Sequence, residues 1–381
     1  MTDVWEDVVG QEDAVERLRA AATDDAAMTH AWLVTGPPGS GRSVAAKAFA
    51  AALQCSGDPV ADEVAVAEVR AGTHPDVTVV TTDKVTISID EVRGLIGLAQ
   101  RAPARGRWRV IVVEDADRML ERTSNVLLKA IEEPPPRTVW VLCAPSPQDV
   151  VVTIRSRCRQ VGLRVPSVEA VAELLVRRDG LEPGLALESA RAAQSHVGMA
   201  RRLARDPEAR ARRRRILESA ARIRGVGDAV LAADDLVETA KAEAAARSEE
   251  RDAREKAELL RALGVEAGAP VPPALRAQVK QLEEDQKRRA TRQQRDSLDT
   301  AMLDLLSLYR DVLVVQLGAS GDVALVNEGA AELVRSLAES STPEQSLHRM
   351  DAIGEARQRL AGNVAPLLAL EAMMVALRPQ A

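Results

Sequence analysis

The chain has 381 residues, of which 46% are hydrophobic and 28% charged, and its net charge is −6. That length allows two or three domains with cores of their own, and the acidic balance argues against a protein that binds nucleic acid through its overall charge. We expect neither a secretory signal nor a membrane-spanning segment. Three widely spaced cysteines suit a reducing compartment, so we expect a cytoplasmic protein.

The first 164 residues alternate short apolar runs with stretches of helical spacing. Runs typical of buried parallel strands lie at 31–34, 77–80, 110–113 and 139–142. Helices are expected over 89–99 and 123–132, and the three prolines that follow end the second helix. This alternation predicts an α/β domain with a parallel sheet over residues 1–164.

Beyond residue 167 the strand-like runs disappear and the pattern becomes helical. Short helices over 168–177, 183–195 and from 198 onward predict a small helical lid at 165–207. An all-helical domain at 208–381 follows, with a highly charged stretch at about 238–295. We interpret this stretch as two solvated helices around a turn at 264–273 rather than as a binding tail. The apolar segment 363–377 is expected to be buried.

The most informative segment is a glycine-rich loop between an expected strand and an expected helix. Its sequence is Gly36-Pro37-Pro38-Gly39-Ser40-Gly41-Arg42-Ser43. Such a loop turns backbone N–H groups toward a phosphate, and the helix N-terminus adds its dipole. Arg42 replaces the usual lysine, which keeps the charge but changes its size and geometry. We predict a nucleotide site with ATP and Mg²⁺ as candidate ligands, and weak or absent hydrolysis.

Two acids directly follow the apolar run 110–113. Glu114 and Asp115 stand where a nucleotide hydrolase carries a metal-binding acid and then an acid that polarises water. The usual order is Asp then Glu, so the reversed order lengthens the first side chain and shortens the second by a methylene. A displacement of about 1 Å at such a site lowers the rate on the order of 100-fold. Solvated acids at a strand end are the alternative interpretation.

The segment from Thr153 to Cys158 ends in Ser-Arg-Cys and makes a family resemblance specific. This ending, after a strand and a proline-containing loop, is typical of the bacterial clamp-loader subunits of DNA polymerase III, which are AAA+ proteins. Other segments that resemble the family are 8–11, 30–33, 71–76, 127–135 and 363–371. The chain most resembles the δ′ branch of that family, of the actinobacterial type.

The resemblance implies an AAA+ P-loop domain, a helical lid and an all-α collar domain within the boundaries given above. It implies a hetero-pentamer with γ/τ and δ subunits that loads the sliding clamp onto primed DNA, where δ′ is largely a rigid stator. Arg157 is then an arginine finger for a neighbour's ATP, and Arg201 a nucleotide contact from the lid. Ser146 lies near the family's strand-end sensor. The resemblance implies a subunit of the DNA-directed DNA polymerase III holoenzyme that has no polymerase chemistry of its own.

The sequence departs from the family at a zinc module that usually precedes segment 71–76. Of its four cysteines only Cys55 is present, and Val60, Glu63 and Val66 stand where the others fall. One thiolate cannot build a tetrahedral structural site, so we predict no zinc. A helix is expected over 62–70 instead.

Other functions stay open on the residues alone. The intact glycine loop also suits an active ATPase like the γ/τ motor subunits. A branch-migration or chaperone ATPase and a small-molecule kinase fit less well, because of Ser-Arg-Cys and the missing acceptor site. A structural ion pair is the alternative interpretation of Arg157, and an ordinary surface residue that of Arg201. The arginine cluster 210–215 lacks interleaved aromatics, so a solvated or collar-facing helix suits it better than DNA binding.

Overall fold

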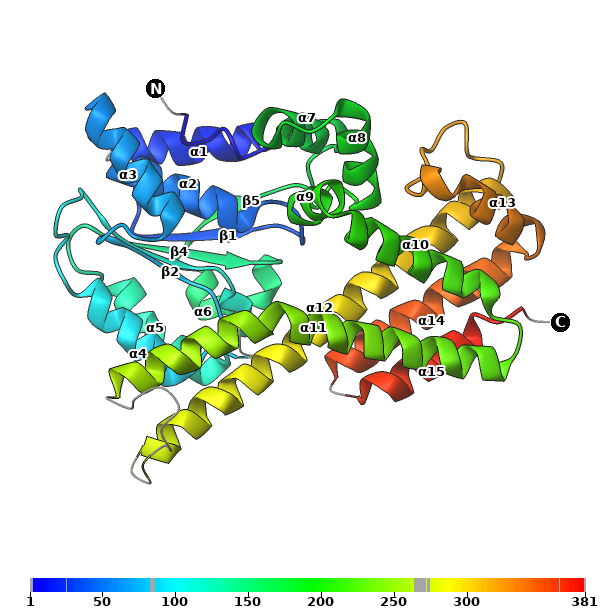
Figure 1. Cartoon of the computed structure of the whole chain (residues 1–381). Coiled ribbons are helices and arrows are strands. Elements are labelled where there is room, and N and C mark those ends of the chain that lie inside the picture. The colour runs from blue at the N-terminus through cyan, green and yellow to red at the C-terminus, as the bar shows by residue number, and fades with distance from the viewer. Residues whose placement is uncertain are drawn as a thin grey trace. The chain divides into compact units, whose positions relative to one another are not determined.

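The computed structural model describes residues 3–24, 26–82, 86–263, 272, 275–362 and 364–379. The chain divides into two compact units, Met1–Ala204 and Arg205–Ala381 (Figure 1). The boundary expected between residues 164 and 165 falls inside the first unit, and it stays a prediction.

A five-stranded parallel sheet forms the centre of the first unit, with the strand order β2-β3-β4-β1-β5 (Figure 1). The strands are β1 (Ala31–Thr35), β2 (Val77–Val80), β3 (Arg109–Val113), β4 (Thr138–Ala144) and β5 (Arg159–Gly162). Every pairing is parallel, with Leu33 opposite Leu142 and Val112 opposite Val141. The four expected strands are confirmed, and with them the α/β class with a parallel sheet. Only Val161 of β5 is buried, so no apolar run marks this strand in the sequence.

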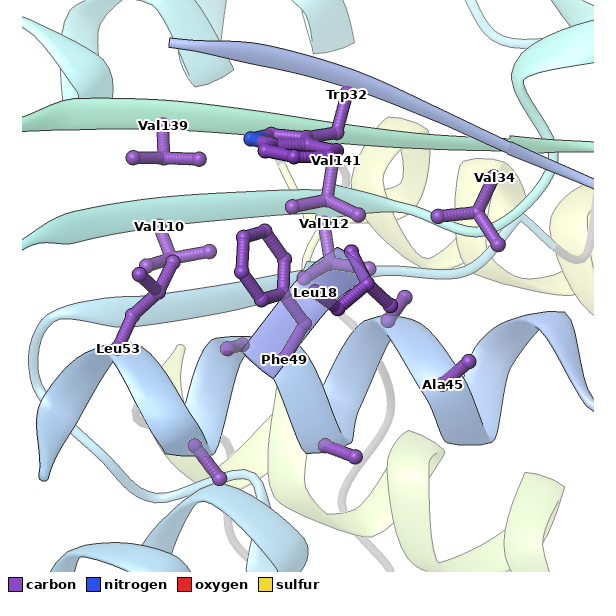
Figure 2. Packing of buried hydrophobic residues seen from close by; sticks show 14 of the residues in the cluster. Leu18, Trp32, Val34, Ala45, Phe49, Leu53, Val110, Val112, Val139 and Val141 are labelled. Carbon is purple, nitrogen blue, oxygen red and sulfur yellow. The ribbon is translucent and has the colours of Figure 1, made fainter. Parts of the chain in front are cut away.

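Helices cover both faces of this sheet (Figure 1). This explains why the strands β1, β3 and β4 are buried throughout. The helices are α1 (Glu12–Thr23), α2 (Arg42–Gln54), α3 (Pro59–Ala71), α4 (Ile89–Ala99), α5 (Glu121–Glu132) and α6 (Val152–Arg155). Helices α1 and α2 bury Leu18 and Phe49 against Trp32 (Figure 2). The rings of Trp32 and Phe49 meet edge to face, with their centroids 5.1 Å apart. Helices α4 and α5 bury Leu95 and Leu127 against the opposite face.

Three short helices complete the first unit, close to the spans expected for a lid. They are α7 (Val168–Asp179), α8 (Pro183–Ala192) and α9 (Val197–Arg205). Helix α8 ends three residues earlier than expected, because Gln194 and Ser195 adopt positive φ angles of 48° and 64°. That backbone turns the chain sharply before α9.

The second unit is a helical assembly with its own core. Its helices are α10 (Pro207–Arg222), α11 (Val226–Ala262), α12 (Arg276–Gln316), α13 (Ala331–Glu339), α14 (Pro343–Ala361) and α15 (Pro366–Ala376). The core includes Leu305, Tyr309 and Met374. Helix α15 is buried on one face only, since Leu368 is 61% exposed, so the expected burial of 363–377 is only partly correct. The turn expected at 264–273, apart from residue 272, lies outside the described residues, as does residue 363.

None of the described helices combines the length and the apolar character that crossing a membrane requires.

Candidate nucleotide site

The glycine loop connects β1 to α2 and is held against the end of β4. The Gly36 N–H points to the carbonyls of Ala144 and Pro145, at 3.4 and 3.2 Å. Gly39 and Gly41 have φ angles of 89° and 85°, a region that L side chains rarely adopt. Gly41 is also the N-cap of α2, which therefore begins at Arg42. A Cβ at Gly41 would meet no atom within 4 Å, so the loop is open at this point.

Arg42 turns back onto its own loop. Its Nη1 donates a hydrogen bond to the Gly36 carbonyl. The lysine of the usual motif reaches the β- and γ-phosphates of a nucleotide. Here the cation at that position has a partner within the protein before any ligand binds.

The two acids lie at the carboxyl end of β3, as expected, and each faces a cation. Glu114 Oε1 lies 2.8 Å from Nζ of Lys47, which projects from α2. Asp115 accepts a hydrogen bond from the backbone N–H of Thr82 at 3.4 Å and lies 3.7 Å from Nε of Arg118. Sequence reasoning missed Lys47. The available signal was that Lys47 is the one charged residue in the sequence between Ser43 and Gln54.

A buried thiol and a half-buried carboxyl adjoin these acids. Burial raises the pKa of Cys143 on β4 to about 12, and the nearby Glu114 acts in the same direction. Burial also raises the pKa of Asp117, with a smaller contribution from Asp115. A thiol with so high a pKa is not a nucleophile at neutral pH, which argues against cysteine chemistry at this site.

Two side chains connect the glycine loop to other parts of the first unit. Gln11 bonds the loop to Arg164, which precedes the expected lid, and His196 of the lid packs on the loop. Gln11 donates to the carbonyls of Ser40 and Arg164, at 3.2 and 2.6 Å, and accepts from the Arg164 N–H at 3.0 Å. His196 packs directly on Gly39, where an added Cβ would lie 3.0 Å from its Cα. Burial lowers the pKa of His196, and the nearby Arg42 acts in the same direction. Sequence reasoning missed His196, which no motif marks.

Arg201, the expected nucleotide contact of the lid, is engaged elsewhere. Its Nε and Nη2 lie 3.0 and 2.8 Å from Oδ1 of Asp179, at the end of α7. This pair joins α9 to α7. A nucleotide-binding role for Arg201 stays a prediction.

Arg157 lies just beyond α6 and is 41% exposed. Its Nη2 is 2.6 Å from Glu132 Oε1, and its Nη1 donates to the Thr153 carbonyl at 2.8 Å and to Ser156 Oγ at 3.4 Å. These partners all lie outside the glycine loop. Ser146, the other family-based candidate, accepts from the Gln148 N–H and caps the short 3₁₀ turn at Pro147–Asp149. Its role as a sensor also stays a prediction.

The segment that stands where the family carries its zinc module is helical. Helix α3 is capped at its N-terminus by Asp58 and covers the three positions where cysteines fall in the family, which confirms the helix expected there. Burial raises the pKa of the Cys55 thiol, with a further contribution from Asp62. Within the described residues, no cluster of three or more His, Cys, Asp or Glu side chains could hold a metal ion. The expectation of no zinc remains a prediction.

The segment 71–76, another family-like stretch, has a structural role here. Asp76 is fully buried and accepts hydrogen bonds from the backbone N–H groups of Ala104, Arg105 and Gly106, at 2.6 to 2.8 Å. Arg109 lies 3.0 Å from it. Asp76 therefore anchors the start of β2 to the loop before β3.

The site fits the phosphates of a nucleotide but not, as it stands, a magnesium ion. The open turn at Gly41 leaves room for a phosphate beside the N-terminus of α2. The oxygen ligands that Mg²⁺ needs here are Ser43 and a strand-end acid. Glu114 is already paired with Lys47, so a metal at this acid must displace or oppose an ammonium group.

The part of the chain that carries the glycine loop is similar to known proteins. The family model described as "DNA polymerase III, delta subunit" matches residues 10–167. The DNA polymerase III subunit delta′ of Pseudomonas aeruginosa is 35% identical over 165 residues, which are 42% of this chain and 50% of that protein. Over these residues the chain is similar to clamp-loader subunits of DNA polymerase III.

The clamp-loader match does not separate the family's branches. The gamma/tau subunit of Mycobacterium tuberculosis is 32% identical over 176 residues, 45% of this chain and 30% of that protein. The chain thus matches at most half the length of these relatives. A solved gamma subunit-related protein of Thermotoga maritima is 14% identical with a TM-score of 0.45, covering 96% of this chain and 99% of that one.

The clamp-loader family match contains the glycine loop, both strand-end acids and Arg157. Arg201 and the whole second unit lie outside it. The roles of these parts therefore rest on their own geometry.

Proposed function

We propose that the chain is a δ′-type, non-motor subunit of a DNA polymerase III clamp loader, and that it supplies Arg157 to a neighbouring subunit's ATP site. The observation that carries this proposal is the internal pairing of its own site. Arg42 is bound to the Gly36 carbonyl and Glu114 to Lys47. The two groups that an ATPase directs at phosphate and at metal are thus both engaged by the chain itself. The reversed order of Glu114 and Asp115 points the same way.

The exposure of Arg157 supports the second half of the proposal. Arg157 and Glu132 are 41% and 44% exposed, and an exposed ion pair of this kind contributes about 0.2–1 kcal/mol. An arginine finger accelerates phosphoryl transfer by roughly 10³ to 10⁵. The free energy lost when Arg157 leaves Glu132 is therefore small compared with the lowering of the activation barrier by a finger in a partner's site.

In this proposal the second unit is the collar that assembles with γ/τ and δ subunits in the cytoplasm. The complex as a whole acts on the sliding clamp and primed DNA. Leu367 and Leu368, exposed at 38% and 61% on α15, are apolar surface of the kind that subunit contacts cover.

An active motor subunit of the γ/τ type is the second candidate. The positive φ angles of Gly39 and Gly41 and the presence of Ser43 at the start of α2 favour it, because the phosphate cradle itself is preserved. This candidate requires substantial ATP turnover by the isolated chain.

The test is reconstitution with cognate γ/τ and δ subunits, sliding clamp and primed DNA. Arg157→Ala is expected to abolish the contribution of the neighbouring ATP site, a loss of roughly 10³-fold or more at that site, and to impair clamp loading. Arg93→Ala is the matched control, because Arg93 is an exposed arginine paired with Asp90 in the same unit. Unchanged turnover in Arg157→Ala would contradict the finger, and rapid turnover by the chain alone would favour the motor.

A further inference from the structure

Lys47 and Glu114 form an ion pair inside the phosphate site that no motif of the family assigns. Glu114 is only 14% exposed, and its backbone N–H is fixed to the Val80 carbonyl at 2.9 Å. Lys47 is 39% exposed and projects from a helix whose other buried positions are almost all apolar. A half-exposed lysine next to a largely buried acid is well placed to neutralise it.

This pairing competes directly with a divalent cation. A carboxylate that already faces an ammonium group at 2.8 Å offers little net negative charge to Mg²⁺. The ammonium group and a metal ion bound to the same carboxylate would also repel each other. Asp115 does not replace Glu114 in this role, since it is shared between the Thr82 N–H and Arg118.

The same site retains enough positive charge to hold phosphates without a metal. One nitrogen of Arg42 donates to the Gly36 carbonyl, but a guanidinium has five N–H donors, so others remain for a ligand. The ammonium group of Lys47 carries three N–H donors, and its Nζ lies 2.8 Å from Glu114 Oε1. The backbone of the glycine loop and the N-terminus of α2 add their dipoles.

We propose that Lys47 is the built-in counter-cation of Glu114, so that the loop binds a nucleoside triphosphate without a divalent cation. This inference deepens the nucleotide site of the proposed function and rests on it. A nucleotide bound in this way has a structural rather than a catalytic role. An ATP bound without its metal lacks the ion that neutralises the charge developing during phosphoryl transfer.

The test is calorimetric titration of the full chain with ATP at fixed ionic strength, once with Mg²⁺ and once with EDTA. For the wild-type chain we expect dissociation constants that agree within about twofold in the two buffers, less than half a kcal/mol. For Lys47→Met we expect binding in EDTA to weaken at least about tenfold, with recovery when Mg²⁺ is added. Lys129→Met is the matched control, an exposed lysine on α5, and should behave as wild type.

Glu114→Gln provides a second variant, whose isosteric amide keeps the fold. It should bind ATP in EDTA at least as tightly as wild type, because Lys47 is then released toward the phosphates. Wild-type binding that needs Mg²⁺, no ATP binding in either buffer, or a Lys47→Met variant as independent of Mg²⁺ as wild type would each overturn the inference. The isolated chain suffices here, so the result is separate from that of Arg157 in the assembled complex.

Discussion

At the residue scale, the two left-handed glycines of the phosphate loop differ in their surroundings. Gly39 and Gly41 have nearly equal φ angles. An alanine at either position is therefore destabilised by about 1–2 kcal/mol, because L residues disfavour the left-handed backbone region. Only at Gly39 would the new methyl also collide with another segment, at 3.0 Å from the His196 Cα. Gly39→Ala should therefore lower the free energy of unfolding by about 3 kcal/mol, and Gly41→Ala by about half as much.

Urea denaturation of both variants beside wild type measures this difference. Gly41→Ala serves as the control for backbone strain, since a Cβ there meets open space. Equal destabilisation of the two variants would mean that His196 does not press on the loop in solution.

Residue types predicted the position of this site better than its pairings. A glycine-rich loop followed by two acids at the end of an apolar run is a specific pattern for a phosphate site. The loop and the strand end could therefore be located from the sequence. The partners of Arg42 and Glu114 depend on rotamers and on which face of α2 meets β3, which sequence spacing does not specify. Arg201 shows the same limit, because its pairing with Asp179 spans two helices.

At the scale of elements, one largely buried arginine of α12 is paired with two acids of α11. Arg289 of α12 has a side chain only 9% exposed and donates to Asp252 at 2.9 Å and to Glu255 at 3.0 Å, both on α11. Arg289→Leu should destabilise this helix pair by about 1–2 kcal/mol, because Asp252 and Glu255 both lose this cation, although Glu255 keeps Arg251 at 2.9 Å and both acids stay partly hydrated. Hydrogen exchange of α11 and α12 measures the change.

The same pair has a defined pH dependence. Hydrogen bonding from Arg289, its main cause, lowers the pKa of Glu255 from 4.5 to about 2. Because the folded pKa is depressed, the stabilisation is complete above pH 4.5 and is lost as pH falls toward 2. The exchange difference between wild type and Arg289→Leu should therefore shrink below pH 4.5. Arg288→Leu, at a position 60% exposed, should show little effect at any pH; an equal effect would contradict a specific role for Arg289.

Elements with two covered faces were the easiest to predict. The runs at 110–113 and 139–142 are apolar throughout because helices pack on both sides of the sheet. Strand β5 pairs only with β1 and buries only Val161, so its sequence lacks that mark. In α15 the apolar composition predicted burial all round, whereas the fold of this chain covers one face and leaves Leu368 exposed.

At the scale of the whole molecule, family resemblance and physical organisation divide the chain differently. The family model ends at residue 167, but the first compact unit continues to Ala204 and includes the three lid-like helices. The hydrophobic clusters follow the compact units. Two clusters consist of residues of the first unit and one of residues of the second. The last buried cluster residue of the first unit is Leu163, and the first of the second unit is Leu217. Sequence similarity therefore detects the part that carries the loop and Arg157, while packing defines the units that fold.

This separation of cores predicts that the two units fold independently. The chain can be cut after Arg205, where α9 ends and before Asp206 caps α10. Fragments 1–205 and 206–381 each exceed the size at which a single core is sufficient, so each should give a cooperative urea transition and a helical circular dichroism spectrum. Fragment 1–205 should also keep the metal-independent ATP binding, because Arg42, Lys47 and Glu114 all lie in it. An unfolded or aggregated fragment would show instead that one unit depends on the other for its stability.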